Sequence, residues 1–198
     1  MRPGFISNTR AHKSSATGPA LGALLRDARG SIAVEFALVA PVLMVVLAGV
    51  IDIGSAAHAR LSLQARVTAA TEYALLQPAP PDQPAAADMA QRLVGLLQGG
   101  GTTGAEAVVN NAASAAWSEG AVTPSAGPGA ATACYCPALS GGAVDWGSPV
   151  VCDTPCAAGG TAGPFVRIAA QARHVSLFPA YGFVAGDTLQ ASAVLRLN

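Results

Sequence analysis

The sequence predicts an α+β protein in which a long N-terminal transmembrane helix leads to a small domain with an antiparallel sheet. Three observations carry this prediction. An apolar run begins near Ser31 and contains no charge from Phe36 to Ile51. Apolar residues then recur at helical spacing until Pro78. Near the C-terminus, residues 188–197 alternate between apolar and polar side chains, as in a half-buried strand.

The composition limits the function classes that the chain can belong to. Its 198 residues suffice for one modest domain and accessory segments. Eleven Lys and Arg residues balance eleven Asp and Glu residues, and there is no long basic run. Because nucleic-acid-binding proteins use a basic surface, we expect no nucleic-acid partner.

The apolar run is expected to be a retained membrane anchor. Residues 36–51 make roughly 24 Å of helix, and including residues 31–34 spans the bilayer core but buries Glu35. The basic residues ahead of the run predict a cytoplasmic N-terminus; they are Arg2, Arg10, Lys13, Arg26 and Arg29. A core helix or a secretory signal cleaved after Ala59 is the alternative. Asp52 and the long segment ahead of the run argue against a signal.

Two helices and two strands are expected beyond the span. The first helix continues to about Gln77, where prolines end it. The second covers Ala85 to Leu97 and stops at Gln98 to Gly101. Its buried side is expected to contain Met89, Leu93, Val94, Leu96 and Leu97.

The C-terminal region predicts an antiparallel pair of strands, Phe165 to Val175 and Thr188 to Leu197. Pro179 to Gly186 would connect them. Ala130 to Cys136 and Ser148 to Cys152 are weaker strand candidates between turns that are rich in Gly and Pro.

Four cysteines form two close pairs, Cys134-x-Cys136 and Cys152-x3-Cys156. Disulfides persist outside the cytoplasm, so we expect two of them. Cysteines at Cys-x-Cys spacing on a strand rarely bond each other, which favours bridges between the pairs over the other connectivities. A zinc site is the alternative, although the spacing differs from common zinc knuckles and no histidine is close.

The sequence contains no catalytic arrangement. His12, His58 and His174 are isolated, as leader, membrane-interface and strand-surface residues respectively. Nucleophile, metal and phosphate-binding motifs are absent from the sequence. We therefore expect no enzymatic activity, no cofactor and no metal.

The most specific motif lies where the basic leader meets the apolar helix. It resembles the prepilin peptidase site of type IV pilin-like proteins, in which a glycine precedes the scissile bond, glutamate is the fifth mature residue and an aromatic residue follows. Gly30, Ser31, Glu35 and Phe36 occupy these positions. A carboxylate at the hydrocarbon edge is costly, and the new amino group of Ser31 would supply a partner. The alternative is a glutamate at the start of an ordinary anchor, where it favours the helix dipole.

The stretch from Arg29 to Ala74 is similar to the N-terminal domain of TadE-like proteins, a family that includes TadF- and TadG-like members. These are pseudopilins of the tight-adherence (Tad, Flp) pilus system. Matching positions include Pro41, Asp52, Gly54, Gln64 and Ala65. Residues 172–198 also look like the C-terminal strands of the family.

The resemblance implies a pilin-like minor pilin, pseudopilin or assembly factor of a Tad-type, type IV-like pilus used in surface adherence. Its implied partners are prepilin peptidase, other pilins and pseudopilins, inner-membrane Tad assembly proteins and the membrane. The expected domains are a cytoplasmic basic leader (1–30), a transmembrane and continuing helix (31–77), and a periplasmic or extracellular α+β domain with four cysteines (78–198). The chain would cross the bacterial inner membrane once.

Two other functions remain open. One is a membrane-anchored periplasmic binding domain that never polymerises. The other is a secreted, disulfide-bonded enzyme released after Ala59. The mature amino terminus distinguishes the three cases, since it would be Ser31, Met1 or Arg60 respectively.

Overall fold

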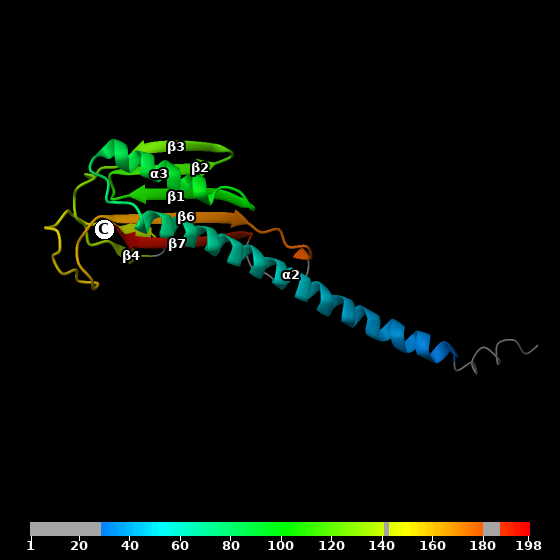
Figure 1. Cartoon of the computed structure of the whole chain (residues 1–198). Coiled ribbons are helices and arrows are strands. Elements are labelled where there is room, and N and C mark those ends of the chain that lie inside the picture. The colour runs from blue at the N-terminus through cyan, green and yellow to red at the C-terminus, as the bar shows by residue number, and fades with distance from the viewer. Residues whose placement is uncertain (1–28, 141–142, 180–186) are drawn as a thin grey trace, which may run out of the picture. The chain divides into compact units, whose positions relative to one another are not determined.

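The computed structural model describes residues 29–140, 143–179 and 187–198. Within these ranges the chain forms two long helices followed by strands (Figure 1). The helices are α2 (Arg29–Leu75) and α3 (Gln83–Leu97). The strands are β1 (Thr102–Val109), β2 (Ala113–Ser118), β3 (Ala121–Ala126), β4 (Ala138–Ser140), β5 (Ala143–Asp145), β6 (Phe165–Arg173) and β7 (Thr188–Arg196).

The chain divides into two units, Met1–Val46 and Leu47–Asn198. In the first unit, large apolar side chains of α2 are exposed all around the helix: Ile32, Val34, Phe36, Leu38, Val39, Val42, Leu43, Met44, Val45 and Val46. A helix that is apolar on every side needs lipid or other helices around it. Among the described residues, α2 is the helix that is long and apolar enough to cross a membrane. The long N-terminal helix is thus confirmed.

The second unit contains a five-stranded antiparallel sheet with the order β3-β2-β1-β6-β7. The predicted C-terminal hairpin is confirmed, with Phe165 opposite Arg196 and Arg173 opposite Thr188. The link between these strands lies mostly outside the described residues. A separate small sheet pairs β4 with β5.

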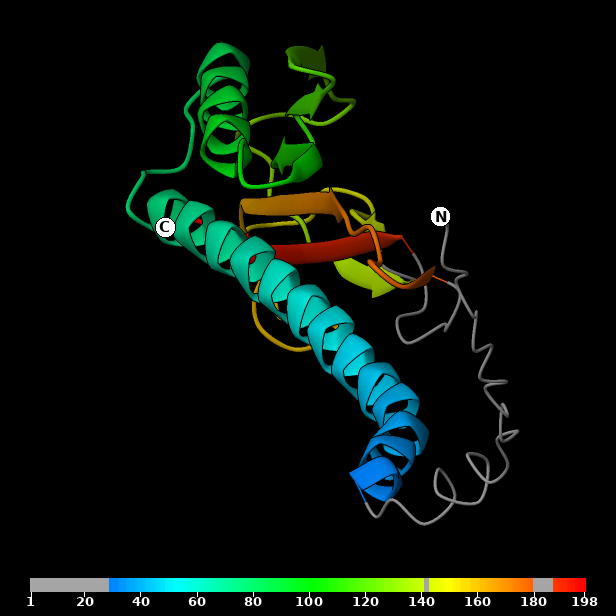
Figure 2. The same cartoon turned by 90° about the vertical axis from the view of Figure 1, so that its right-hand side faces the viewer.

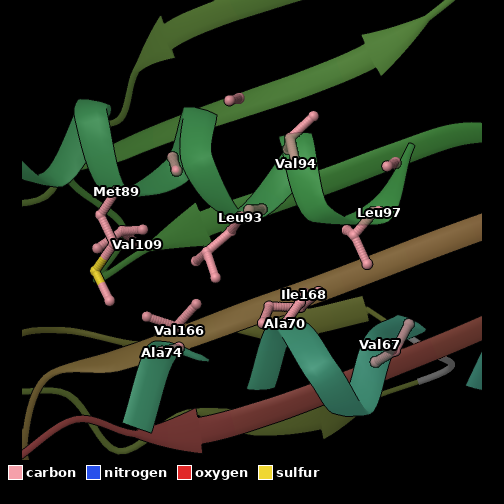
Figure 3. Packing of buried hydrophobic residues seen from close by; sticks show 14 of the residues in the cluster. Val67, Ala70, Ala74, Met89, Leu93, Val94, Leu97, Val109, Val166 and Ile168 are labelled. Atoms are coloured by element: carbon pink, nitrogen blue, oxygen red, sulfur yellow. The ribbon is translucent and has the colours of Figure 1, made fainter. Parts of the chain in front are cut away.

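The core lies between one face of the large sheet and the two helices (Figure 2). On α2, residues spaced by four, three and four positions are buried, as the helical period requires; they are Leu63, Val67, Ala70 and Ala74. Figure 3 shows Val67, Ala70 and Ala74 on one side of the cluster and the side chains of α3 on another. Val109, Val166 and Ile168 of the sheet complete the cluster.

The second predicted helix is confirmed, and α3 begins two residues earlier than expected. Asp82 caps its N-terminus by accepting a hydrogen bond from the Ala85 amide at 2.8 Å. The buried side contains Ala86, Met89, Ala90, Leu93, Val94 and Leu97. The prediction for Leu96 was wrong, because this side chain points outward and is 46% exposed.

The turn after α3 depends on glycine. Gly99, Gly100 and Gly101 have φ angles of 96°, 54° and 85°, a region that side chains with a Cβ avoid. The guanidinium of Arg66 lies against Gly100 and donates to the Gln98 carbonyl at 2.8 Å. A charged donor from α2 therefore satisfies a terminal carbonyl of α3.

The sequence did not predict the strands β1, β2 and β3. The expected strands at Ala130 to Cys136 and Ser148 to Cys152 were wrong, since this region forms only isolated bridges, Cys134 with Val150 and Tyr135 with Gly163. The Gly- and Pro-rich segments between these residues do not supply the consecutive partners that a strand needs.

Candidate functional site

The predicted processing motif lies at the start of α2. The helix begins at Arg29, so the bond between Gly30 and Ser31 falls in its first turn. Glu35 and Phe36 are both exposed in the first unit. Glu35 follows Ser31 by four residues, which is about one helical turn along α2. The rest of the predicted leader, residues 1–28, lies outside the described residues.

The first unit also carries small residues at helical spacing. Ala33, Ala37 and Ala40 follow one another at intervals of four and three, which places them along one face of α2. In lipid, small side chains let neighbouring helices approach closely. This face of α2 is suited to packing against similar helices.

Asp52 is the first charged residue after the apolar run, and it is fully buried. Its carboxylate accepts hydrogen bonds from the Ser176 hydroxyl and from the Leu177 amide, the latter at 2.7 Å. These partners lie 124 and 125 residues further along the chain. Asp52 thus attaches the segment after β6 to α2 within the second unit.

His174 belongs to the same segment, and its prediction as a strand-surface residue was wrong. The side chain is buried, and its Nε2 atom has no hydrogen-bond partner within the described part of the chain. Its backbone amide donates to the Asp187 carbonyl at 2.8 Å. The chain leaves β6 at Arg173, and the Leu177 amide then donates to Asp52 of α2.

Replacing Asp52 by alanine is expected to release residues 174–178 from α2. Hydrogen bonds to a charged carboxylate are stronger than neutral ones, so the Leu177 amide should exchange about tenfold faster or more. Hydrogen exchange followed by mass spectrometry measures this. Asp187→Ala is the matched control, because the hydrogen bond between His174 and Asp187 uses the backbone oxygen of Asp187. Unchanged exchange in Asp52→Ala would show that the contact does not order the segment.

The four cysteines form two disulfides, Cys134–Cys152 and Cys136–Cys156, with Cα separations of 5.2 and 5.5 Å. The predicted disulfides, and the preference for bridges between the two pairs, are confirmed. None of the four is a free thiol, so the zinc alternative lacks its thiolate ligands. No group of three or more metal-ligating side chains occurs among the described residues.

Asn110 holds the disulfide segment against the sheet, and the sequence analysis did not single it out. Its side chain is fully buried and its amide nitrogen lies within hydrogen-bond distance of the carbonyls of Ala130, Ala131 and Ala133, at 3.2, 2.7 and 2.7 Å. Its side-chain oxygen accepts from the Phe165 amide at 3.2 Å. One residue of the β1–β2 turn thus joins β6 to the residues just before Cys134.

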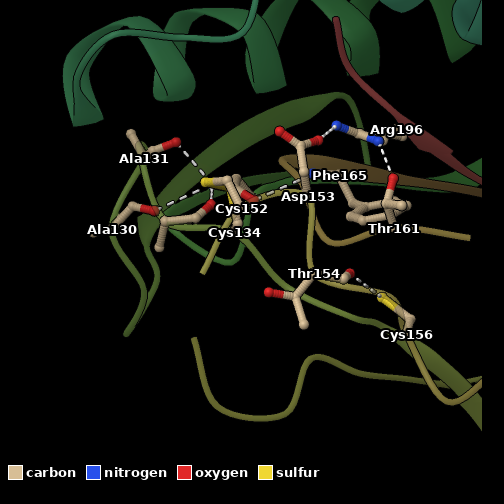
Figure 4. Close-up of a disulfide and its surroundings, with 12 residues drawn as sticks. Ala130, Ala131, Cys134, Cys152, Asp153, Thr154, Cys156, Thr161, Phe165 and Arg196 are labelled. Atoms are coloured by element: carbon tan, nitrogen blue, oxygen red, sulfur yellow. Dashed lines mark hydrogen bonds and ion pairs between the residues drawn. A yellow bond between two sulfur atoms is a disulfide. The ribbon is translucent and has the colours of Figure 1, made fainter. Parts of the chain in front are cut away.

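Two further contacts fix this segment. Tyr135, between the first two cysteines, is buried and meets Trp146 edge to face at 5.9 Å between ring centres. Figure 4 shows Arg196 of β7 reaching Asp153, at 2.7 Å, and the hydroxyl of Thr161. The disulfide segment therefore has anchors in the β1–β2 turn and on β7.

The face of the sheet away from the helices carries a shallow groove of about 390 Å³. An ion pair between Glu106 and Arg167, with 2.5 Å between nitrogen and oxygen, lies in it. The remaining polar lining residues are Ser118, Gln171, Gln190 and Ser192. The two charges neutralise each other, and the groove is open to solvent. It presents no arrangement of nucleophile and base.

Comparison with known families found a match over the N-terminal helix. Residues 30–71 match the family model described as TadE-like protein. The match begins at Gly30 and ends inside α2, and it confirms the resemblance of the N-terminal stretch; the resemblance of residues 172–198 stays a prediction. TadE-like proteins are components of pilus systems, so the match indicates a protein associated with the Tad pilus. Searches of curated proteins and of solved structures found no match.

Proposed function

We propose that this protein is a minor pilin, pseudopilin or assembly factor of a Tad-type pilus, and that prepilin peptidase cleaves it after Gly30. The observation that carries the proposal is the TadE-like match, which starts at the glycine and covers the apolar helix. Assembly of a surface fibre, rather than catalysis, is the work of such a protein. The partners are the peptidase, other pilins and pseudopilins, and Tad proteins of the inner membrane.

The proposed topology assigns a place to each part of the chain. Residues 1–30 form a cytoplasmic leader, residues 31–77 cross the inner membrane and continue as a helix, and residues 78–198 lie in the periplasm or beyond. The disulfides support this assignment, because such bonds persist in oxidising compartments. The exposed apolar side chains of the first unit support the membrane position.

Glu35 is proposed to dock the helix during assembly. After cleavage, the amino group of Ser31 would lie one helical turn before Glu35, on the same face. The carboxylate would pair with this amino group or with that of a neighbouring subunit. Such pairing offsets the cost of a carboxylate at the hydrocarbon edge, and the alanine face lets the helices pack closely.

Co-expression with a prepilin peptidase is expected to yield a mature chain that begins at Ser31. Gly30→Ala should slow cleavage, and Gly30→Glu should block it, because a charged side chain replaces the residue before the scissile bond. Edman sequencing or mass spectrometry of the mature chain measures the outcome. Gly22→Glu introduces the same charge elsewhere in the leader and should leave cleavage intact.

Any other result of the cleavage experiment contradicts the proposal. Normal cleavage of Gly30→Glu contradicts the processing site. A mature chain that begins at Met1 supports a non-polymerising anchored domain, and one that begins at Arg60 supports a secreted protein.

Glu35→Ala is expected to abolish surface pili while cleavage and membrane insertion remain largely normal. Removing the carboxylate eliminates the docking contact without hindering insertion of the apolar helix. Mature-form abundance, membrane fractionation and pili counted by microscopy are compared in one strain. Glu72→Ala, an exposed glutamate on the same helix, is the matched control. Normal piliation of Glu35→Ala would show that Glu35 does not dock subunits.

A further inference from the structure

One end of the second unit exposes large apolar side chains from two distant parts of the chain. In the segment after β6, Val175 is 71% and Leu177 is 62% exposed. This segment is attached to α2 through Asp52. The α2 residues close to Asp52 that also expose large apolar side chains are Leu47, Val50, Ile51 and Ile53.

The segment after β6 has an inverted pattern of polarity. His174 is buried, and Ser176 turns its hydroxyl to the carboxylate of Asp52. The alternate residues, Val175 and Leu177, point outward. In a water-exposed segment the polar residues face the solvent and the apolar residues face the protein. Polar side chains turned inward and apolar ones turned outward are suited to an apolar medium.

We propose that residues 174–178 insert into the surface of the lipid bilayer beside the membrane anchor. The proposal rests on the anchor role of α2 in the proposed function. The ligand is the bilayer interface, where apolar side chains enter the boundary between headgroups and acyl chains to about 5–10 Å. Val175 and Leu177 are the inserted side chains, and the domain gains a second membrane contact besides its helix.

The level of the segment along α2 identifies lipid as the occupant. Asp52 directly follows the charge-free run that ends at Ile51, which is the point where the helix would leave the hydrocarbon. The Leu177 amide lies 2.7 Å from the Asp52 carboxylate, so the segment sits at this level. The carboxylate is fully buried by these contacts and does not face the lipid. The exposed side chains of the segment therefore lie at the level of the exposed apolar α2 residues next to Asp52, within the second unit.

Tryptophan scanning with quenching by brominated lipid tests the proposal on the full-length chain. The protein is reconstituted in phosphatidylcholine and phosphatidylglycerol vesicles whose acyl chains carry bromine. The test variant is Leu177→Trp. Leu139→Trp is the matched control on β4, where the side chain is 72% exposed. Leu43→Trp, in the charge-free run, reports on the anchor itself.

The added emission of each variant is its difference from the wild-type protein, which contains Trp117 and Trp146. Bromine is expected to lower the added emission of Leu177→Trp and Leu43→Trp about twofold and to leave that of Leu139→Trp unchanged. Near-ultraviolet circular dichroism verifies the fold of each variant. Val175→Trp replaces Leu177→Trp if the latter does not fold, and the same quenching is expected.

The remaining outcomes overturn the proposal in distinguishable ways. Quenching of Leu43→Trp without quenching of Leu177→Trp leaves the anchor intact and refutes only the lipid contact. Absence of quenching at both positions refutes the anchor as well. Equal quenching of Leu177→Trp and Leu139→Trp indicates unspecific adsorption. In one further outcome, bromine does not change the emission of Leu177→Trp, but dilution of the protein with lipid does. This result identifies a second copy of the chain as the occupant and also refutes the lipid contact.

Discussion

Asn110→Ala is expected to lower the free energy of unfolding of the second unit by about 3 kcal/mol. Asn110 is fully buried. The substitution removes its amide nitrogen, which lies within hydrogen-bond distance of three carbonyls, and its side-chain oxygen, which accepts from the Phe165 amide. Buried polar groups left without partners account for most of this loss. Urea denaturation in detergent, followed by the emission of Trp117 and Trp146, measures it.

Asn111→Ala is the control that isolates the backbone contribution. Asn110 and Asn111 have similar left-handed backbones, with φ angles of 49° and 52°. Alanine tolerates this region less well than asparagine, so each substitution should cost about 1 kcal/mol for that reason alone. Equal destabilisation by the two variants would show that the hydrogen bonds of the Asn110 side chain add nothing to stability.

Removal of either disulfide is expected to cost about 3 kcal/mol, and removal of both about twice that. The bridges span 18 and 20 residues, and closing such loops lowers the conformational entropy of the unfolded chain. The paired variants are Cys134→Ala with Cys152→Ala, and Cys136→Ala with Cys156→Ala. Each serves as the control for the other, and denaturation is measured without reductant.

Peptide mapping verifies the connectivity. Chymotrypsin cleaves after Tyr135 and separates the first two cysteines, and a protease that cleaves before Asp153 separates the last two. Without reduction, the peptide with Cys134 should remain joined to that with Cys152, and the peptide with Cys136 to that with Cys156. Four alkylated thiols, stoichiometric zinc or the opposite pairing would contradict the structure.

The elements at the two ends of the chain were predictable because their patterns are long and regular. The helix up to Leu75 follows from an apolar run and a helical period, and β7 from its alternation. The middle strands were missed because alanine dominates their buried positions and has little strand preference. These positions are Ala105, Ala107, Ala113 and Ala115. Small side chains there let α3 pack closely through Ala86 and Ala90.

The sequence did contain local signals for the middle strands, in the turn residues that separate them. Asn110 and Asn111 stand between apolar runs, and Glu119 and Gly120 stand between β2 and β3. All four have positive φ angles, which hairpin turns require and which Asn and Gly adopt readily. These pairs of residues indicated two hairpins.

The candidate site was predictable only where it is local in sequence. The processing motif, which stays a prediction, spans a few consecutive residues, and the close spacing within each pair of cysteines indicated the disulfides. By contrast, Asp52 and Ser176 are 124 residues apart, and no periodic pattern relates them. The role of Asn110 likewise depends on carbonyls that are 20 to 23 residues away. Hydrogen bonds of this kind are a product of the tertiary fold.

The two disulfide loops overlap along the chain, since Cys136 lies inside the loop that Cys134 closes and Cys152 lies inside the other. When the chain crosses a membrane from its N-terminal side, Cys134 and Cys136 emerge first and have only each other as partners. Their native partners follow more than a dozen residues later. Any bond formed early between neighbours must be exchanged before the domain is complete. In the proposed topology, maturation of this protein therefore depends on the thiol-exchange capacity of the compartment that receives the domain.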